Sequence, residues 1–256
     1  MWPRPAMGAW CVMDNPLIRK LEFGARLETA DRARLEEICR RARRVEARTD
    51  LIEQGEPPSM VRLVLEGMAY RYKLLPNGRR SIVGFLLPGD FCDLHVAILG
   101  RMDHAIATAV TSTVVEIDRD TIEDITRTEP RITRAFWWAT LVDEATLREW
   151  LASMGHRPAD KQMAHLFCEL LIRLQAVGRA SVDSFRLPVT QDELADTLGI
   201  SVVHANRVLQ QLREDGLVTM RNRTVKIHDV GRLYAFAEFD PTYLHLAPPR
   251  NEPEAA

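Results

Sequence analysis

The sequence predicts an α+β protein in which a domain of short strands is followed by one long helix and then by a small domain of helices and a β-hairpin. Three observations support this order. Between residues 44 and 117, short apolar runs alternate with polar residues and are broken by Gly, Pro and Asn, as in antiparallel strands. From Pro130 to about Met154 the apolar residues recur every three or four positions, which indicates a single helix. Residues 187–227 then contain two short helical patterns and a hairpin pattern.

Length and periodicity also set the expected boundaries. A chain of 256 residues suits two domains. We expect a disordered leader at residues 1–12, with Met13 as an alternative start, and a flexible tail with four prolines at residues 240–256. Between them lie the strand domain at 13–128, the long helix at 129–156 and the C-terminal domain at 157–239.

The composition is that of an ordinary globular protein, with 46% hydrophobic residues, 27% charged residues and a net charge of −2. The cysteines have neither metal nor redox spacing, so no disulfide framework or zinc site is expected. They are Cys11, Cys39, Cys92 and Cys168. No apolar run reaches the roughly 18 residues of a membrane span, and the N-terminus lacks the apolar stretch of a signal peptide. We therefore expect a cytoplasmic protein that makes no membrane contact.

Two short helices precede the strands, one opened by Asp14-Asn15-Pro16 and one following Thr29-Ala30-Asp31. Within the strand region, Asn77-Gly78 marks a hairpin turn because both residues tolerate positive φ. Many short antiparallel strands with regular turns predict a sandwich or barrel. The expected strands are Arg44–Arg48, Met60–Glu66, Met68–Leu74, Ser81–Phe85, Ala105–Thr111 and Thr113–Ile117.

The long helix carries a pattern typical of a coiled-coil seam. At roughly 1.5 Å per residue it spans about 35–40 Å. Its apolar face can pack on the strand domain alone, but so long a helix usually has a second partner, and the spacing favours a parallel homodimer. The residues expected at the dimer seam are Trp137, Thr140, Glu144, Leu147, Leu151 and Met154.

The C-terminal domain contains the signals of a helix-turn-helix. Thr190 and Glu193 form a capping box that starts a short helix. Gly199 ends that helix and Ser201 caps the next one. Helix, tight turn with glycine and helix is the layout of this motif. Around it we expect a helix at Ala159–Val177, the second helix of the motif at Val202–Glu214, and wing strands at Leu217–Met220 and Thr224–Ile227.

The outward face of the second helix favours DNA as a partner over a merely solvated polar face. A helix fits the major groove, where Arg bonds guanine and Asn or Gln bonds adenine. A two-fold dimer would present two such helices about 34 Å apart, one turn of DNA. With six Lys/Arg and six Asp/Glu between Arg186 and Asp229, affinity must come from how these groups are placed. The expected DNA-binding residues are Thr190, Gln191, Ser201, Val202, Val203, His204, Asn206, Arg207, Gln210, Arg221 and Arg223.

This order of parts resembles the Crp/Fnr family of bacterial transcription regulators, over about Met13 to Tyr234. The motifs that carry the resemblance are Thr190–Ala195, Leu198–Ser201, Asn206–Leu209, Leu212–Leu217 and, in the strand domain, Leu86–Phe91. The resemblance implies a cyclic-nucleotide-binding-like jelly roll, a homodimer through the long helix, and a regulator instead of an enzyme. It also implies binding to double-stranded DNA at a palindromic promoter site, with RNA polymerase as a further partner.

Several positions depart from the family pattern. Where cyclic-AMP-responsive members carry a ribose-binding Glu and a phosphate-binding Arg-Ser pair, this chain has Leu94 and His104-Ala105, which disfavours cyclic AMP. Only Cys11 lies where the oxygen-sensing branch clusters its ligands, which disfavours an iron–sulfur cofactor. In the second helix Arg207 matches the family's base-reading Arg. Val203 replaces a Glu, so the preferred half-site is expected to differ.

An effector is expected, if one exists, at the segment after the Leu86–Phe91 motif, and the sequence identifies no cofactor. The candidate residues are Gly89, Cys92, Asp93, His95, Asp103 and His104. A metal, haem or oxidant sensor competes there with a polar loop in which Cys92 packs inward, and the neighbouring Asp93 disfavours a reactive thiolate. Two other functions stay open: a constitutive DNA-binding dimer with a structural barrel, and a cupin-like metal enzyme, for which only His95 and His104 are available.

Overall fold

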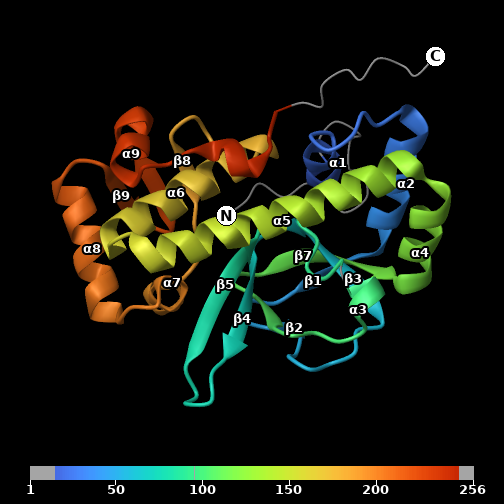
Figure 1. Ribbon diagram of the computed structural model, residues 1–256, viewed down its shortest axis with the longest axis horizontal. Helices are drawn as coiled ribbons and strands as arrows, with labels where there is room; N and C mark the ends of the chain where they lie inside the picture. The colour runs from blue at the N-terminus through green and yellow to red at the C-terminus, as the bar shows by residue number, and fades with distance from the viewer. Residues whose placement is uncertain (1–14, 95, 248–256) are drawn as a thin grey trace.

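The computed structural model describes residues 15–94 and 96–247 of the chain. Its parts follow the expected order: a β domain, one long helix, and a C-terminal domain of helices with a small sheet (Figure 1). The long helix α5 runs along the β domain and continues to the helices of the C-terminal domain. The α+β architecture predicted from the sequence is therefore confirmed.

The β domain is a sandwich of two antiparallel sheets with strand orders β1-β7-β3 and β2-β6-β4-β5. Each of β6 and β7 thus pairs with an early strand of the domain, an arrangement typical of a jelly roll. Strand β2 was not expected, because three residues are too few to show alternation. The strands are β1 (Ala42–Val45), β2 (Asp50–Ile52), β3 (Met60–Glu66), β4 (Ala69–Leu74), β5 (Arg80–Leu86), β6 (Ala105–Thr108) and β7 (Ser112–Asp118).

Short helices close the ends of the sandwich. Asn15 caps the first of them by accepting a hydrogen bond of 3.0 Å from the amide of Leu17, which confirms the helix start expected at Asn15-Pro16. Cys39 is buried in η1, directly after the second helix. These helices are α1 (Pro16–Leu21), α2 (Thr29–Ile38), η1 (Cys39–Arg41), α3 (Val96–Leu99) and α4 (Arg119–Thr128).

Helix α5 (Pro130–His156) has 27 residues and starts with a proline, whose missing amide hydrogen costs nothing in a first turn. Near its start, Ile132 and Phe136 pack in the core of the β domain. Near its end, Trp150 packs in the core of the C-terminal domain. One helix therefore joins both cores. In the described part of the chain, no helix combines the length and the apolar content that a membrane crossing requires.

The C-terminal domain is a helical bundle with a three-stranded sheet of order β8-β10-β9. Strand β8 and helix α9 were not expected from the sequence. The elements are α6 (Ala159–Ala176), β8 (Ser184–Arg186), α7 (Gln191–Leu198), α8 (Val202–Glu214), β9 (Val218–Arg221), β10 (Thr224–Ile227), α9 (Val230–Ala237) and η2 (Pro241–Leu244).

The expectation of a loose tail from residue 240 is wrong for its first part. Leu244 is buried, and the hydroxyl of Tyr243 donates a hydrogen bond of 3.0 Å to the Glu169 carboxylate. Apolar burial and one part-buried hydrogen bond thus hold η2 on helices α5 and α6. The remainder of the expected tail, from residue 248, lies outside the described residues, as does the expected leader.

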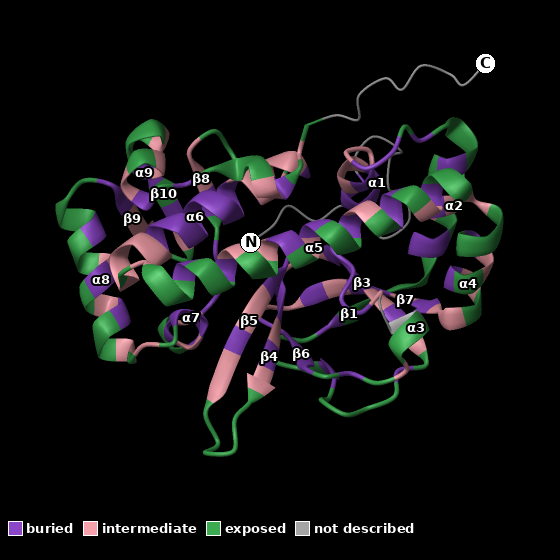
Figure 2. Ribbon diagram, in the orientation of Figure 1, coloured by how far each residue is buried: buried purple, intermediate pink, exposed green. Residues whose placement is uncertain are grey.

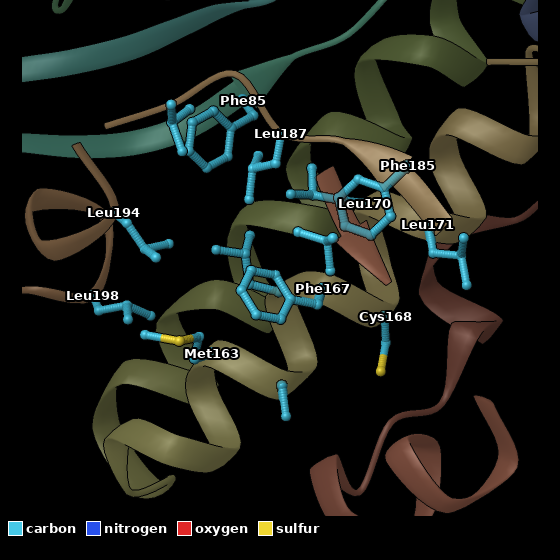
Figure 3. Packing of buried hydrophobic residues seen from close by; sticks show 14 of the residues in the cluster. Phe85, Met163, Phe167, Cys168, Leu170, Leu171, Phe185, Leu187, Leu194 and Leu198 are labelled. Atoms are coloured by element: carbon cyan, nitrogen blue, oxygen red, sulfur yellow. The ribbon is translucent and has the colours of Figure 1, made fainter. Parts of the chain in front are cut away.

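One side of the β domain packs in the same apolar core as the C-terminal domain. In Figure 2, buried positions occur along β4, β5 and α6. Phe85 of β5 lies beside Leu187 and near Leu194 of the C-terminal domain (Figure 3). At the rim, the Arg80 guanidinium pairs with the Asp196 carboxylate of α7 at 2.8 Å. The placement of the helix-turn-helix on β5 therefore depends on burial as well as on a charge pair.

Candidate nucleic-acid interface

The first helix of the motif, α7, begins with the capping box that the sequence predicts. The Thr190 hydroxyl accepts a hydrogen bond of 3.1 Å from the Glu193 amide, and the Glu193 carboxylate accepts one of 2.7 Å from the Thr190 amide. Two of the four amides left free at a helix start are thereby satisfied. Thr190 itself stays half-exposed at the edge of the domain.

The turn between α7 and α8 directs the second helix outward. Gly199 adopts φ of 66°, a left-handed conformation that costs glycine little. The Ser201 hydroxyl then accepts a hydrogen bond of 3.2 Å from the His204 amide and caps α8. Both features were expected from the sequence.

Helix α8 buries one face and exposes the other. Ala205, Val208 and Leu212 are buried against the rest of the domain. On the opposite face Val203 is 70% exposed, and Arg207 and Gln210 are exposed too. The other expected DNA-binding residues in this region differ from one another in exposure. Ser201 and His204 are exposed, whereas Val202 and Asn206 are half-buried.

The wing is a tight hairpin. Strands β9 and β10 pair with Arg221 opposite Thr224, so Asn222 and Arg223 alone form the turn. Both have positive φ, 50° and 59°, as a type I′ turn requires. Strand β9 therefore extends one residue further than expected, and Arg221 and Arg223 are exposed at the tip.

A groove of about 410 Å³ separates α8 from the wing. Its wall includes Arg213 and Asn222, which sequence reasoning missed. Arg213 could have been found, because it lies three residues after Gln210 on the same helical face. The Oδ1 atom of Asn206, on the same wall, is enclosed and has no hydrogen-bond partner in the described structure. The groove is lined by Thr190, Gln191, Leu194, Asn206, Leu209, Gln210, Arg213, Val218, Met220, Arg221, Asn222 and Arg223.

The candidate effector residues of the β domain have structural partners of their own. Gly89 has φ of 91°, and a Cβ there would lie 2.6 Å from the Pro16 carbonyl oxygen, so this position needs glycine for packing against α1. Asp93 is fully buried and accepts hydrogen bonds from the Arg62 amide at 2.6 Å and its guanidinium at 3.3 Å. Burial raises the pKa of Asp93 to about 6, against the opposing effect of Arg62.

Cys92 is fully buried, as the polar-loop interpretation expected. Burial, and then the charge of Asp93, raise the pKa of its thiol well above the ordinary value. His104 is nearly buried and shares a hydrogen bond of 2.8 Å with the exposed Asp103 carboxylate. Burial lowers the pKa of His104, although Asp103 opposes this. His95 lies outside the described residues, and among those described no three His, Cys, Asp or Glu side chains gather as metal ligands would.

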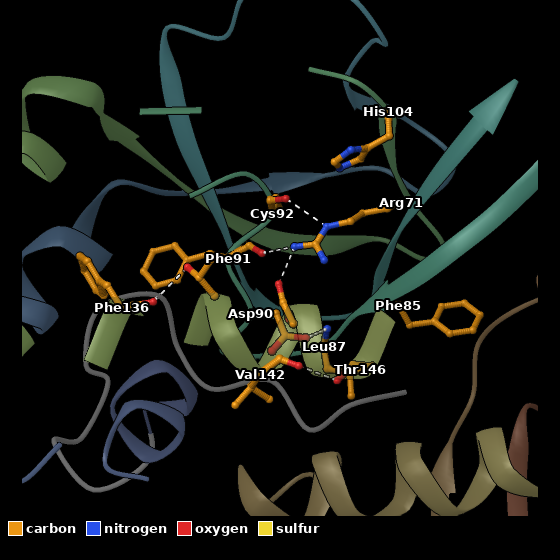
Figure 4. A network of polar contacts seen from close by, with 12 residues as sticks. Arg71, Phe85, Leu87, Asp90, Phe91, Cys92, His104, Phe136, Val142 and Thr146 are labelled. Carbon is orange, nitrogen blue, oxygen red and sulfur yellow. Dashed lines mark hydrogen bonds and ion pairs between the residues drawn. The ribbon is translucent and has the colours of Figure 1, made fainter. Parts of the chain in front are cut away.

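Two charged residues that sequence reasoning missed occupy the centre of this region. Arg71 of β4 donates to the carbonyl oxygens of Phe91 and Cys92 at 3.1 and 3.3 Å, with His104 close by (Figure 4). Asp90 accepts hydrogen bonds from the Leu87 amide at 2.8 Å and from the Arg173 guanidinium at 2.8 Å, and it pairs with Lys20. Burial alone would raise the pKa of Asp90, but Lys20 and Arg173 outweigh it and hold the pKa below the ordinary value.

Comparison with known protein families matches both halves of the chain. Residues 42–129 match the cyclic nucleotide-binding domain, and residues 161–236 match the Crp-like helix-turn-helix domain. The two matches fall on the β sandwich and on the bundle that carries α7 and α8. The fold and this pair of domains define a transcription regulator with a helix-turn-helix DNA-binding domain.

Relatives cover most of the chain. It is 28% identical to the nitrogen fixation regulation protein FixK of Bradyrhizobium diazoefficiens, over 86% of this chain and 91% of that protein. It is 28% identical to the transcriptional activator protein FnrL of Cereibacter sphaeroides, over 84% and 88%. The solved structure of FixK2 from Bradyrhizobium japonicum has the same fold, with a TM-score of 0.69 and 23% identity over 76% of this chain and 96% of that one. The chain thus contains the two domains of Crp-type regulators, and its relatives are Crp/Fnr transcription regulators and not enzymes.

Proposed function

We propose that the protein acts in the cytoplasm as a homodimer that binds a palindromic promoter site, with one copy of α8 in the major groove of each half-site. RNA polymerase is the expected further partner at such a promoter. The observation that carries this proposal is the pair of uncovered faces on α5 and α8: one is apolar and suits a second copy, and the other is polar and suits DNA.

The apolar face of α5 supports dimerisation. Among the described residues, five of the eleven exposed large apolar side chains lie on this one helix: Trp137, Leu141, Leu147, Leu151 and Met154. Four of them belong to the proposed seam, whose remaining members Thr140 and Glu144 are also exposed. Leu141 was not expected there, although it lies four residues after Trp137. A stripe of this kind on a long helix is typical of an association surface.

The groove between α8 and the wing supports the DNA-binding assignment. Arg207 and Gln210 are exposed where base edges would lie, and Val203 offers a methyl contact to thymine. Arg213, Arg221 and Arg223 line or border the groove where the sugar–phosphate backbone would pass. The residues assigned to DNA therefore come from α8, strand β9 and the wing turn, which lie on one surface.

DNA binding that needs no effector is a second candidate function. The hydrogen bonds of Arg71 within the expected effector region favour it. The residues chosen for an effector site are engaged in packing or in hydrogen bonds with the chain itself, as described above for Gly89, Asp93 and His104. Gating by an unknown effector remains a proposal, and the contacts of these residues do not support it.

Genome-wide footprinting of the full-length protein tests the proposed function. We expect protected sites upstream of genes, each with an inverted repeat whose half-sites are centred about one helical turn apart. Arg207→Ala expressed at the same level should lose most of these sites. Protection that is spread evenly over the genome, or sites without an inverted repeat, would contradict the proposal.

A further inference from the structure

Arg71 lies in the part of the β domain where the resemblance places the effector. It is paired across the sheet with Ile106, next to the His104-Ala105 position. Its donors reach the carbonyl oxygens of Phe91 and Cys92, shortly before Leu94. Those two positions correspond to the phosphate-binding pair and the ribose-binding Glu of cyclic-AMP-responsive members. The guanidinium therefore lies beside residues 91 and 92 and close to His104 (Figure 4).

The same guanidinium also reaches the long helix. Its Nη2 donates to the Asp143 carboxylate of α5 at 2.8 Å. With side chains 20% and 30% exposed, the two charges are partly shielded from water, which makes the loss of either partner costly. On α5, Asp143 lies one turn from the seam residues Thr140 and Leu147, so this ion pair adjoins the proposed dimer interface.

A second arginine holds the preceding residues from the side of the C-terminal domain. Arg173 of α6 donates to the Phe85 carbonyl oxygen at 3.0 Å and to the Asp90 carboxylate at 2.8 Å. It also pairs with Glu169 at 2.8 Å, and the same Glu169 accepts from the Trp150 indole of α5 at 2.8 Å. The segment 85–92 is thus bound to α5 by Arg71 and to α6 by Arg173.

We propose that Arg71 replaces a small-molecule effector: its contacts with the segment 91–92 and with Asp143 connect the β domain to the dimerisation helix, and the protein binds its operator without a ligand. This inference rests on the proposed function, because it concerns how the two DNA-binding domains are held. The guanidinium is part of the chain and is charged at every physiological pH, so the connection that it makes is permanent.

Hydrogen exchange tests the connection independently of DNA. Asp143→Asn keeps the shape of the side chain and removes its charge. We expect faster amide exchange in peptides covering residues 87–94, which are far from Asp143 in the sequence, together with faster exchange around residues 140–147. Arg131→Gln is the matched control, because it removes an ion pair between α5 and Asp31 of α2, away from this segment. Unchanged exchange at 87–94 in Asp143→Asn, or an equal change in Arg131→Gln, would overturn the inference.

Operator binding tests the regulatory part. Dialysed wild-type protein should bind an operator found by footprinting with the same affinity whether cyclic AMP, a protein-free filtrate of a cell lysate, or buffer is added. Asp143→Asn should bind at least about fivefold more weakly, a modest allosteric coupling, and Arg131→Gln should not. Wild-type protein that binds only with the filtrate, or Asp143→Asn that binds as wild type does, would refute the replacement of an effector by Arg71. Failure of the wild type to bind under every condition would instead refute the proposed function, and the exchange experiment would still decide whether Arg71 makes the connection.

Discussion

Within the described part of the chain, helices α5 and α8 each leave one face uncovered, and the two faces differ in chemistry. On α5 the uncovered side chains are large and apolar, as in Leu147 and Leu151, which are 55% and 73% exposed. On α8 they are mostly polar, with Arg207 and Gln210 beside Val203. Apolar area favours a protein partner because burying it is favourable, whereas fixed donors favour a ligand with matching acceptors. The difference supports our proposal that a second copy of the chain covers one helix and that DNA binds to the other.

The largest effect is expected from charging the apolar face. Replacing both Leu147 and Leu151 with Lys should give monomers and lower operator affinity by about 10²–10⁴-fold, because the second half-site contact is no longer intramolecular. Light scattering and operator titration measure the two results. The matched control, Ala152→Lys with His156→Lys, adds charge at exposed positions of the same helix outside the seam and should stay dimeric. A dimeric Leu147/Leu151 variant would place the interface elsewhere.

Truncating the polar face should affect base recognition and leave the dimer intact. Arg207→Ala should lose about 1–3 kcal/mol of binding free energy at the operator and discriminate less among bases at one position of each half-site. Titrations against the operator and against a scrambled duplex of equal length measure this. Equal losses on both duplexes would make Arg207 a phosphate contact instead of a base reader.

The turn that directs the polar face outward can be tested with a pair of glycines. Gly199→Ala should lower the free energy of unfolding by about 1–2 kcal/mol, because φ of 66° is unfavourable for alanine. Near Gly199 a Cβ would meet only the Met154 Cε at 3.9 Å, so a clash does not complicate the result. Gly155→Ala, inside α5 with open space around it, should instead raise stability by up to about 1 kcal/mol. Denaturant unfolding measures both, and equal signs would contradict the assigned role of the turn.

The smallest effect is expected at the groove. Arg213→Ala should weaken binding to cognate and scrambled DNA alike and reduce the slope of log affinity against log salt by about 1, as expected for one lost phosphate contact. Titrations between low and moderate salt measure the slope. An unchanged slope would remove Arg213 from the backbone contacts and leave the groove to the wing arginines.

The sequence predicts local features of this fold well. Caps and turns at Thr190, Gly199 and Ser201 depend on residues within four positions of each other, so their hydrogen bonds could be expected before the structure was known. The same holds for the start and end of α5, which periodicity and Pro130 define.

Features made by distant residues could not be predicted in the same way. Arg71 and Asp143 are 72 residues apart, and Arg173 and Asp90 are 83 apart, so no spacing rule relates them. Strand β8 has three residues and needs β10 beside it to be recognised as a strand. Residues 240–244 belong to the stretch expected as a loose tail, and only the positions of Glu169, His165 and Phe239 explain why Tyr243 is held.

We propose that two paired copies present α8 to successive turns of one duplex. Inserting five base pairs between the half-sites of the operator tests it most directly, because half a helical turn moves one half-site to the opposite side of the DNA. We expect affinity to fall to that of a single half-site, and an insertion of ten base pairs to remove only part of this loss. Equal affinity for the normal and the five-base-pair operator would contradict the account.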